Sequence, residues 1–250
     1  MLRSFARLAK GLARWGAPRC GPPGAEAASR GVLPSSQMPL WKAAALFHES
    51  EHAKDYAIPN ASWTPEMVNQ FNRFMAMAKD GTWKRLPSYR NVADHVPVRM
   101  RQGNELKDRA SRLFLRNLDE EGMGFEYAMF LNLSEKRMVS MFQLGPYLEG
   151  PPGFVHGGCI ATILDSVLGT CAIFVAGRVL TANLTINYKS PIPLGSVVLV
   201  ESKLDRIEGR KVFVTGHVQS VDGQTVHAEA TALFIQFQLK DSIQQQASSK

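Results

Sequence analysis

The chain has 250 residues, of which 45% are hydrophobic and 20% are charged, so it is long and apolar enough to bury a substantial core. Its formal net charge is +7, but residues 1–30 carry six basic side chains against Glu26 alone, which leaves about +2 for the remainder. Positive charge confined to one terminus does not form an electrostatic footprint for DNA or RNA, so we expect no nucleic-acid partner.

Residues 1–36 are typical of a mitochondrial transit peptide. On a helix, the basic side chains Arg3, Arg7, Lys10 and Arg14 share one face, and apolar side chains lie opposite. The segment is nearly free of acidic residues and lacks the uninterrupted apolar stretch of a secretory signal. We therefore expect a mitochondrial location, in the matrix or associated with the inner membrane. A disordered basic tail, or a helix that binds a membrane surface peripherally, is the alternative.

Residues 37–112 are predicted to form an N-terminal extension with one amphipathic helix at about residues 64–80. Thr64 is a typical N-cap, and Pro65 suits the first turn of a helix. Beyond the helix, Trp83–Tyr89 is expected to be an irregular, packed connection. An apolar stripe is expected to pack the helix against the rest of the chain, through Val68, Phe71, Met75 and Ala78.

No metal site and no disulfide is predicted. His48-Glu49-Ser50-Glu51-His52 matches the pattern in which two histidines on one helical face bind zinc. The motif adjoins the presequence, no strongly apolar helix surrounds it and no third ligand stands out, so we assign it no metal. Cys159 and Cys171 fall on one predicted helix without Cys-x-x-Cys spacing, which agrees with a reducing compartment.

Residues 113–240 are predicted to form one domain of short strands around a single apolar helix, followed by a polar tail at residues 241–250. Tight turns separate most of the strands, as in antiparallel hairpins. Three strands, one helix and four strands, in this order, predict an α+β domain whose antiparallel sheet wraps around the helix. The predicted strands are Leu113–Leu118, Phe125–Leu131, Arg137–Leu144, Leu180–Tyr188, Ser196–Ile207, Lys211–Ser220 and Thr225–Gln238.

The predicted helix, Cys159–Gly177, contains a single charged residue, Asp165. Its length is close to that of a membrane span, but a carboxylate at mid-bilayer depth costs roughly 2.5 to 3.5 kcal/mol, which favours a helix buried in a protein core. At 100° per residue, the bulky Ile160, Ile163, Val167 and Phe174 lie opposite Asp165. The face around Asp165 is small and leaves room for a substrate or a partner helix; it consists of Gly158, Ala161, Thr162, Gly169, Ala172 and Ala176.

A turn rich in proline and glycine, Pro151–Gly158, leads into the helix and ends in His156-Gly157-Gly158. Helix N-termini present unpaired N–H groups that attract negative charge, so Gly157 or Gly158 can polarise a substrate carbonyl. The same turn also suits a purely structural helix start. His156 precedes Asp165 by nine residues, which is about 13.5 Å of rise and half a turn, so the two cannot meet within one protomer. We therefore expect a homodimer with two shared sites, able to pair into a higher oligomer.

These motifs resemble those of the hotdog-fold acyl-CoA thioesterases over roughly Leu113–Leu239. Gly145–Phe154, Trp83–Tyr89 and Leu204–Lys211 are similar to the mitochondrial members four and five of the thioesterase superfamily. The resemblance implies a hotdog fold, in which an antiparallel sheet wraps one long buried helix. It also implies hydrolysis of medium- to long-chain fatty acyl-CoA to free fatty acid and coenzyme A. No cofactor is expected, because the coenzyme A thioester is the substrate.

The resemblance further implies roles for individual residues. Asp165 would activate water or attack the thioester carbonyl directly, and Thr181 would position Asp165 or the water. The carbonyl would be held by Gly157 and Gly158, with His156 nearby. The phosphates of coenzyme A need cationic and amide groups as hydrogen-bond donors. The alternative interpretation of the candidate residues is an ordinary solvent-exposed face. The candidates are Asn187, Lys189, Arg206, Arg210 and Lys211.

Two alternatives stay open. Cys159 lies at the helix start, three residues after His156, where a thiol with a lowered pKa can act as the nucleophile. In the other alternative, the domain is a hotdog module that binds acyl-CoA or a protein kinase with little turnover, because the name given to one member of the resembled group describes a kinase modulator. For Cys159, a small buried helix residue is the plainer interpretation. A costly carboxylate retained in an apolar helix favours catalysis over a pure binding module.

Overall fold

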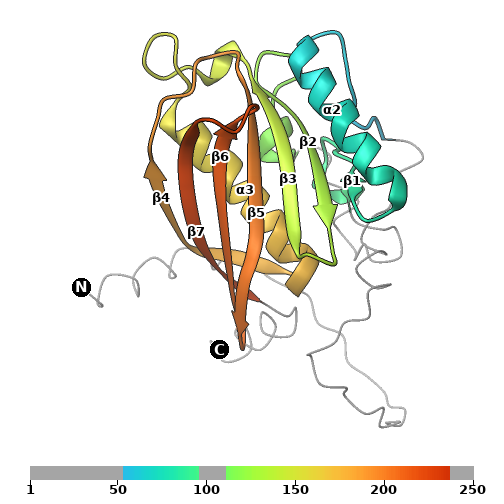
Figure 1. Ribbon diagram of the computed structural model, residues 1–250, viewed down its shortest axis with the longest axis vertical. Coiled ribbons are helices and arrows are strands. Elements are labelled where there is room, and N and C mark those ends of the chain that lie inside the picture. The colour runs from blue at the N-terminus through green and yellow to red at the C-terminus, as the bar shows by residue number, and fades with distance from the viewer. Residues whose placement is uncertain (1–52, 96–110, 237–250) are drawn as a thin grey trace, which may run out of the picture. The chain divides into compact units, whose positions relative to one another are not determined.

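The computed structural model describes residues 53–95 and 111–236. The predicted transit peptide at residues 1–36, the His48–His52 motif and the polar tail at residues 241–250 lie outside the described residues. The described part contains a seven-stranded sheet with one long helix against one face and a shorter helix against the other (Figure 1).

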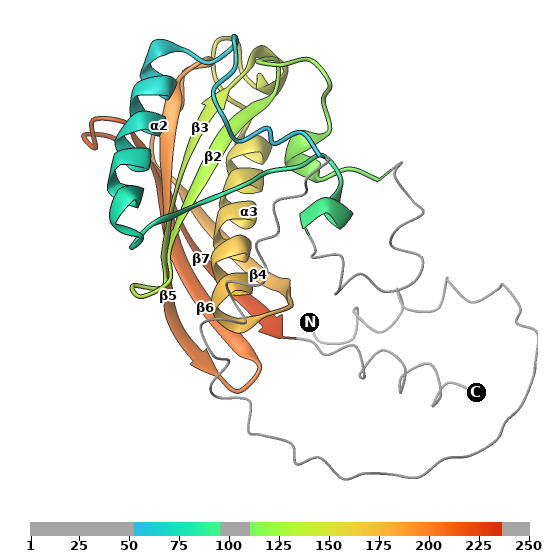
Figure 2. The ribbon, with the colours of Figure 1, turned by 90° about the vertical axis from the view of Figure 1, so that its right-hand side faces the viewer.

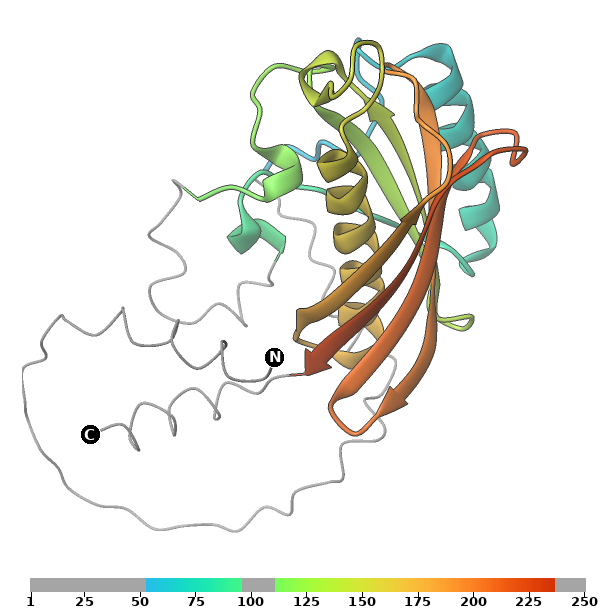
Figure 3. The same ribbon diagram turned by 90° about the vertical axis from the view of Figure 1, so that its left-hand side faces the viewer.

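The sheet is antiparallel throughout and has the strand order β1-β2-β3-β5-β6-β7-β4. It curls around α3, while α2 lies on its outer face (Figures 2 and 3). This is the predicted α+β hotdog arrangement, with β4 left as an edge strand. The elements are α2 (Pro65–Met77), β1 (Lys84–Leu86), β2 (Phe125–Asn132), β3 (Arg137–Leu144), α3 (Gly157–Ala176), β4 (Val179–Tyr188), β5 (Val197–Glu208), β6 (Lys211–Ser220) and β7 (Val226–Gln236).

Helix α3 is the core helix of the sheet. By length and composition it is apolar enough to cross a membrane, but its bulky side chains, Ile163, Leu164, Val167 and Leu168 among them, are fully buried in the core under the sheet. Gly216 in β6 allows the close approach, because a Cβ at that position would lie 2.7 Å from Leu168 Cδ1 and 2.6 Å from the carbonyl oxygen of Glu201. The core interpretation of this helix is therefore correct.

Helix α2 begins where the sequence predicts, with the Thr64 side chain accepting a hydrogen bond from the N–H of Met67. It continues as a 3-10 turn to Asp80. Its buried face differs from the predicted stripe: Met67, Phe71 and Phe74 are buried, whereas Met75 is 38% exposed. The helix is rotated by about one position because the aromatic rings of Phe71 and Phe74 pack against Phe130 on the outer face of β2.

Two predicted segments are wrong. Trp83–Tyr89 is not wholly irregular, because it contains β1, which pairs with β2. Leu113–Leu118 is not a strand but contains the 3-10 turn Phe114–Arg116. The buried side chain of Arg116 explains the turn, since its guanidinium donates hydrogen bonds to the Ser88 hydroxyl and to backbone carbonyls of β2. These contacts join segments far apart in the sequence, so local alternation cannot indicate them.

Candidate active site

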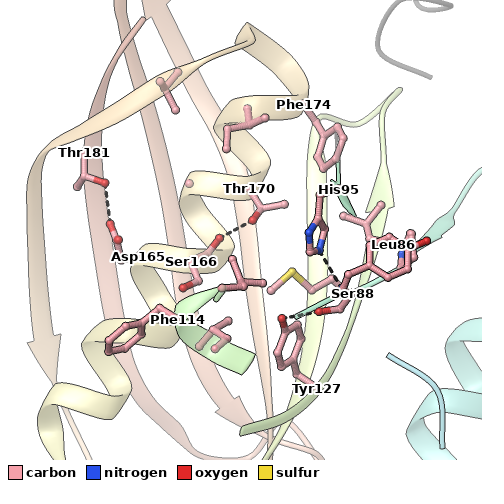
Figure 4. Close-up of a pocket in the computed structure, with 18 of the residues that line it drawn as sticks. Leu86, Ser88, His95, Phe114, Tyr127, Asp165, Ser166, Thr170, Phe174 and Thr181 are labelled. Atoms are coloured by element: carbon pink, nitrogen blue, oxygen red, sulfur yellow. Dashed lines mark hydrogen bonds between the residues drawn. The ribbon is translucent and has the colours of Figure 1, made fainter. Parts of the chain in front are cut away.

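A cavity of about 350 Å³ lies between the exposed side of α3 and the N-terminal extension (Figure 4). Its wall is mainly apolar, and Asp165 is the one acidic side chain among the described residues that line it. The extension supplies one side of the cavity through Leu86–Tyr89 and His95, together with Leu113–Leu115, which directly follow it. Sequence reasoning gave the extension no such role, because no motif in it indicates that it approaches α3.

The face of α3 that lines this cavity is not quite the predicted small-residue face. Ala172 is fully buried in the core, whereas Ser166, Thr170 and Ile173 line the cavity beside Asp165 and Gly169. The helix is therefore rolled by part of a turn relative to the expectation, because Leu168 and Ala172 both pack under the sheet. The result is a cavity face with more hydroxyl groups than predicted.

Asp165 is held by Thr181, whose hydroxyl donates a hydrogen bond of 2.9 Å to Asp165 Oδ1 (Figure 4). A bulge in β4 makes this contact geometrically possible. Farther along β4, Ile186 and Tyr188 face α3, and strict alternation would turn Thr181 away from the helix. The register against β7 shifts between Thr181 and Asn183. This bulge reverses the alternation of side chains along β4, so Thr181 faces α3.

At the helix N-terminus, His156 is the N-cap, and its Nδ1 accepts a hydrogen bond of 2.8 Å from the N–H of Gly158. An accepting Nδ1 fixes the neutral tautomer with the proton on Nε2, so the ring presents Nε2–H as a donor. The Gly158 N–H is thereby occupied, while the Gly157 N–H has no acceptor among the described residues. The Tyr188 hydroxyl donates to the Gly157 carbonyl at 3.0 Å and fixes the turn against β4.

His156 and Asp165 open into different hollows of one protomer. His156, Gly158 and Cys159 line a second hollow of about 480 Å³, whereas Asp165 lines the cavity beside the extension. This separation agrees with the argument from helix geometry that the two side chains do not meet within one chain.

Cys159 is poorly suited to act as the nucleophile. The side chain is only 7% exposed, and burial raises the pKa of its thiol to about 12. The thiol therefore stays protonated at neutral pH, although it lies at a helix N-terminus. The structure thus contradicts the alternative of a thiolate mechanism.

Three of the cations expected to bind coenzyme A phosphates lie far from Gly157 within one chain, whereas Lys189 directly follows Tyr188, whose hydroxyl contacts the Gly157 carbonyl. Arg210 donates to the carbonyl of Gln236, whose amide in turn donates to the carbonyl of Ala176 at the C-terminal end of α3. Gly157 is at the other end of this 20-residue helix, about 30 Å away. Arg206 and Lys211 belong to the same β5–β6 turn region.

Several of these charges already have partners. Arg206 forms ion pairs with Asp205 and Glu208, at 2.5 and 2.6 Å. Lys189 Nζ lies 3.1 Å from Glu229, which is the register partner of Asn187. Asn187 and Tyr188 point to opposite faces of β4 because side chains alternate along a strand. A phosphate-binding role for this set stays a prediction.

Within residues 53–95 and 111–236, no group of three His, Cys, Asp or Glu side chains is placed to hold a metal ion. Among the described residues, the cavity contains a single carboxylate and the hydroxyl that holds it, and a helix N-terminus with a free N–H lies outside the cavity.

Residues 152–227 match the family model described as "Thioesterase superfamily". Acyl-coenzyme A thioesterase THEM4 of Xenopus laevis is 50% identical over 202 residues, which cover 79% of this chain and 87% of that protein. The chain belongs to the thioesterase superfamily. Within this family, acyl-coenzyme A thioesterase THEM5 of Mus musculus is 38% identical over 203 residues, covering 79% and 81% of the two chains. This thioesterase is therefore more similar to THEM4 of Xenopus laevis than to THEM5 of Mus musculus.

A more distant relative of this thioesterase comes from Candida albicans and is named "Uncharacterized protein, mitochondrial". It is 29% identical over 103 residues, which cover 40% of this chain and 45% of that protein.

Proposed function

We propose that this member of the thioesterase superfamily hydrolyses medium- to long-chain fatty acyl-CoA to a free fatty acid and coenzyme A, with Asp165 at the reacting centre. The observation that carries the proposal is a carboxylate, held by Thr181, at the wall of a mainly apolar cavity. Such a cavity suits an acyl chain, and a carboxylate at its wall can act on the thioester carbonyl of a bound acyl-CoA. The names of the similar THEM4 and THEM5 proteins support the substrate class.

Two routes connect Asp165 to the product. As a base, it takes a proton from water, whose oxygen attacks the thioester carbonyl carbon, and the proton then passes to the departing thiolate. As a nucleophile, its oxygen attacks the carbonyl and expels the thiolate, and water hydrolyses the resulting anhydride. Both routes place negative charge on the carbonyl oxygen, which needs hydrogen-bond donors. The Gly157 N–H and the His156 Nε2–H are the donors we propose.

These donors come from a second copy of the chain in our proposal. β4 is an edge strand whose Leu180 and Tyr188 side chains are 63% and 54% exposed, and an exposed edge can pair with another strand. Along β4, Thr181 marks the level of Asp165 and Tyr188 marks the level of Gly157. Antiparallel pairing of two β4 strands therefore moves the Gly157 turn of one copy toward Asp165 of the other.

The same pairing supports a role for the β5–β6 turn. Arg206, Arg210 and Lys211 lie near the start of β4, so the Gly157 turn of a second copy would approach them and bring the coenzyme A phosphates within reach. We also place the protein in mitochondria, because its first 36 residues have the charge pattern of a transit peptide and one relative carries a mitochondrial name.

The test is thiol release from a panel of acyl-CoA esters by the wild type and by Asp165→Asn. Asn keeps the shape of Asp but cannot remove a proton, so we expect a loss of at least about 100-fold in kcat. Asp222→Asn, in the exposed β6–β7 turn, is the matched control and should keep the wild-type rate. Wild-type turnover by Asp165→Asn, or no turnover of any ester by the wild type, would overturn the proposal.

Shared sites have a separate test in mixed dimers. Asp165→Asn lacks the carboxylate and His156→Asn lacks the imidazole donor, so each homodimer should be slow. A heterodimer of the two contains one site with both groups intact, and mixing after partial unfolding should restore part of the activity. No recovery in a mixture that sedimentation shows to contain dimers would contradict sites shared between copies.

A further inference from the structure

The side of the cavity opposite Asp165 carries polar groups that an unsubstituted acyl chain does not need. Ser88 and Tyr127 line the cavity there, with their hydroxyl oxygens 2.7 Å apart, while Asp165 and Thr181 lie on the other side (Figure 4). Both side chains are almost completely buried, with exposures of 4% and 2%. A polar pair in an apolar wall is costly unless something uses it.

Counting protons shows that this pair has one donor left over. Arg116 Nε–H donates to the Ser88 oxygen at 3.1 Å. The contact between Ser88 and Tyr127 uses one of their two hydroxyl protons, whichever residue is the donor. The other proton has no acceptor among the described residues. A hydroxyl donor nine-tenths buried therefore faces the cavity without a partner, which is unfavourable unless a ligand or water accepts it.

The charges around this donor are already balanced. Arg116 stacks on the Tyr127 ring at 3.7 Å, and its Nη1 lies 4.0 Å from Glu126. Asp55, which accepts from the Ser88 N–H, pairs with Arg85 at 2.7 Å. A ligand that brought a full negative charge here would find no uncompensated cation among these residues, so the site suits an uncharged oxygen.

The neighbouring His95 does not compete for the same ligand. Its Nε2 accepts from the Tyr89 N–H at 3.1 Å, and its Nδ1 lies 3.2 Å from the Asn91 carbonyl, to which it donates in this tautomer. Burial lowers the pKa of this imidazole, which agrees with a neutral ring. Both of its nitrogens are used, so His95 does not compete with the Ser88–Tyr127 pair as a donor to a ligand.

We infer that the cavity accepts acyl chains carrying an uncharged oxygen, such as a hydroxyl group, at or near the end remote from the thioester. The Ser88–Tyr127 pair donates its spare hydrogen bond to that oxygen, and the apolar walls bind the methylene groups between. The inference rests on the proposed function for the position of the thioester at Asp165. It adds a specificity site, built by the N-terminal extension and β2, that distinguishes oxygenated from plain fatty acyl groups.

The experiment compares matched coenzyme A esters over chain lengths from octanoyl to hexadecanoyl, each plain, ω-hydroxylated and ω-carboxylated. In a wholly apolar cavity a buried hydroxyl without a partner lowers kcat/KM by roughly 5- to 150-fold. We expect instead that, at the chain length that reaches Ser88, the ω-hydroxy ester is hydrolysed at least as efficiently as the plain one. The ω-carboxy ester should be hydrolysed less efficiently. A uniform penalty for hydroxylation at every length would overturn the inference.

Variants locate the effect. Ser88→Ala/Tyr127→Phe removes both hydroxyls and should lower the ratio of kcat/KM for ω-hydroxy over plain ester by about 2- to 12-fold, the worth of one hydrogen bond. The ratio cancels general losses of folding or activity. Tyr127→Phe alone keeps the acceptor of Arg116 and leaves the Ser88 proton as the spare donor, so it should keep the ratio close to the wild-type value. If the double variant does not fold, the comparison of ester lengths in the wild type still tests the inference. Ser140→Ala removes a buried sheet hydroxyl outside the cavity and should leave the ratio unchanged.

Different outcomes of these assays would refute the specificity site and the proposed function. If the wild type hydrolyses plain esters but no length favours the ω-hydroxy ester, the function stands and the specificity site is refuted. If no ester is hydrolysed, calorimetry with dodecanoic and ω-hydroxydodecanoic acids still tests the cavity. Tighter binding of the hydroxy acid that is lost in the double variant would support the site, and equal binding would overturn it.

Discussion

Replacing Gly158 by Ala should separate the stability of α3 from the activity of the turn that precedes it. A Cβ at position 158 would lie 2.9 Å from His156 Nδ1 and 3.1 Å from its Cε1, so the imidazole must move and release the Gly158 N–H. Loss of an N-cap costs about 1 kcal/mol, whereas Ala in place of Gly in a helix gains up to about 1 kcal/mol. The terms oppose each other, so the free energy of unfolding should change by less than about 0.5 kcal/mol.

The same variant should lose most of its activity. A displaced imidazole no longer directs its Nε2–H at the proposed carbonyl oxygen, and loss of one such donor costs about 100-fold in kcat. His156→Asn is the matched variant, because Asn is a good N-cap that keeps α3 capped but lacks the Nε2 donor. Both variants should therefore melt close to the wild type and release thiol from acyl-CoA about 100-fold more slowly.

Calorimetric melting and thiol release on the same preparations check this prediction. A His156→Asn variant with the wild-type rate would refute the donor role of the imidazole. A Gly158→Ala variant with full activity but a lower melting temperature would show that the displaced imidazole is not needed for turnover and that its role is to cap the helix.

The remaining predictions concern the groups around Asp165 and the buried side chains nearby. Thr181→Val removes the donor to Asp165 and should lower kcat/KM by about 10-fold, whereas Thr181→Ser keeps the hydroxyl and should stay close to the wild type. The control is Thr185→Val, which removes a hydroxyl that contacts Asn183 and should also stay close to the wild type. Cys159→Ala should leave turnover nearly unchanged, and iodoacetamide should not inhibit the native enzyme, because burial raises the pKa of this thiol to about 12; rapid inactivation would contradict this. Burial lowers the pKa of His95 below its ordinary value of 6.5, so at acidic pH the unfolded chain binds a proton that the folded chain does not. The free energy of unfolding should therefore fall as the pH drops below about 6.5, and His95→Gln should reduce that dependence in urea melts at several pH values.

Much of the hotdog core could be predicted from local patterns. Strands β2 to β7 and helix α3 were each predicted within about two residues, because their apolar runs are long and end at turn residues. β1 was missed because it has only three residues and depends entirely on pairing with β2. Leu113–Leu118 was mistaken for a strand because it is a short, largely apolar run that ends at the turn residues Asp119–Gly122, although Arg116 is buried.

The candidate site, too, was predictable from the sequence only in part. Asp165 was identifiable as the one charge in an apolar helix, and the nine residues that separate it from His156 indicated two copies. The occupied N–H of Gly158 and the free N–H of Gly157 were not predictable, because they depend on the rotamer of His156. The burial of the Cys159 thiol, which was the plainer of its two interpretations, is decided by packing in the core.

By itself, the sequence determined an antiparallel sheet, an apolar helix within it and a lone carboxylate on that helix, because hydrophobic period and turn residues act locally. Tertiary structure alone decided what surrounds the carboxylate. The bulge after Thr181 turns its hydroxyl toward Asp165, because a register shift arises from pairing with β7. Ser88 and Tyr127 share a cavity with Asp165 because the extension packs beside α3, and contacts between such distant segments leave no periodic pattern in the sequence.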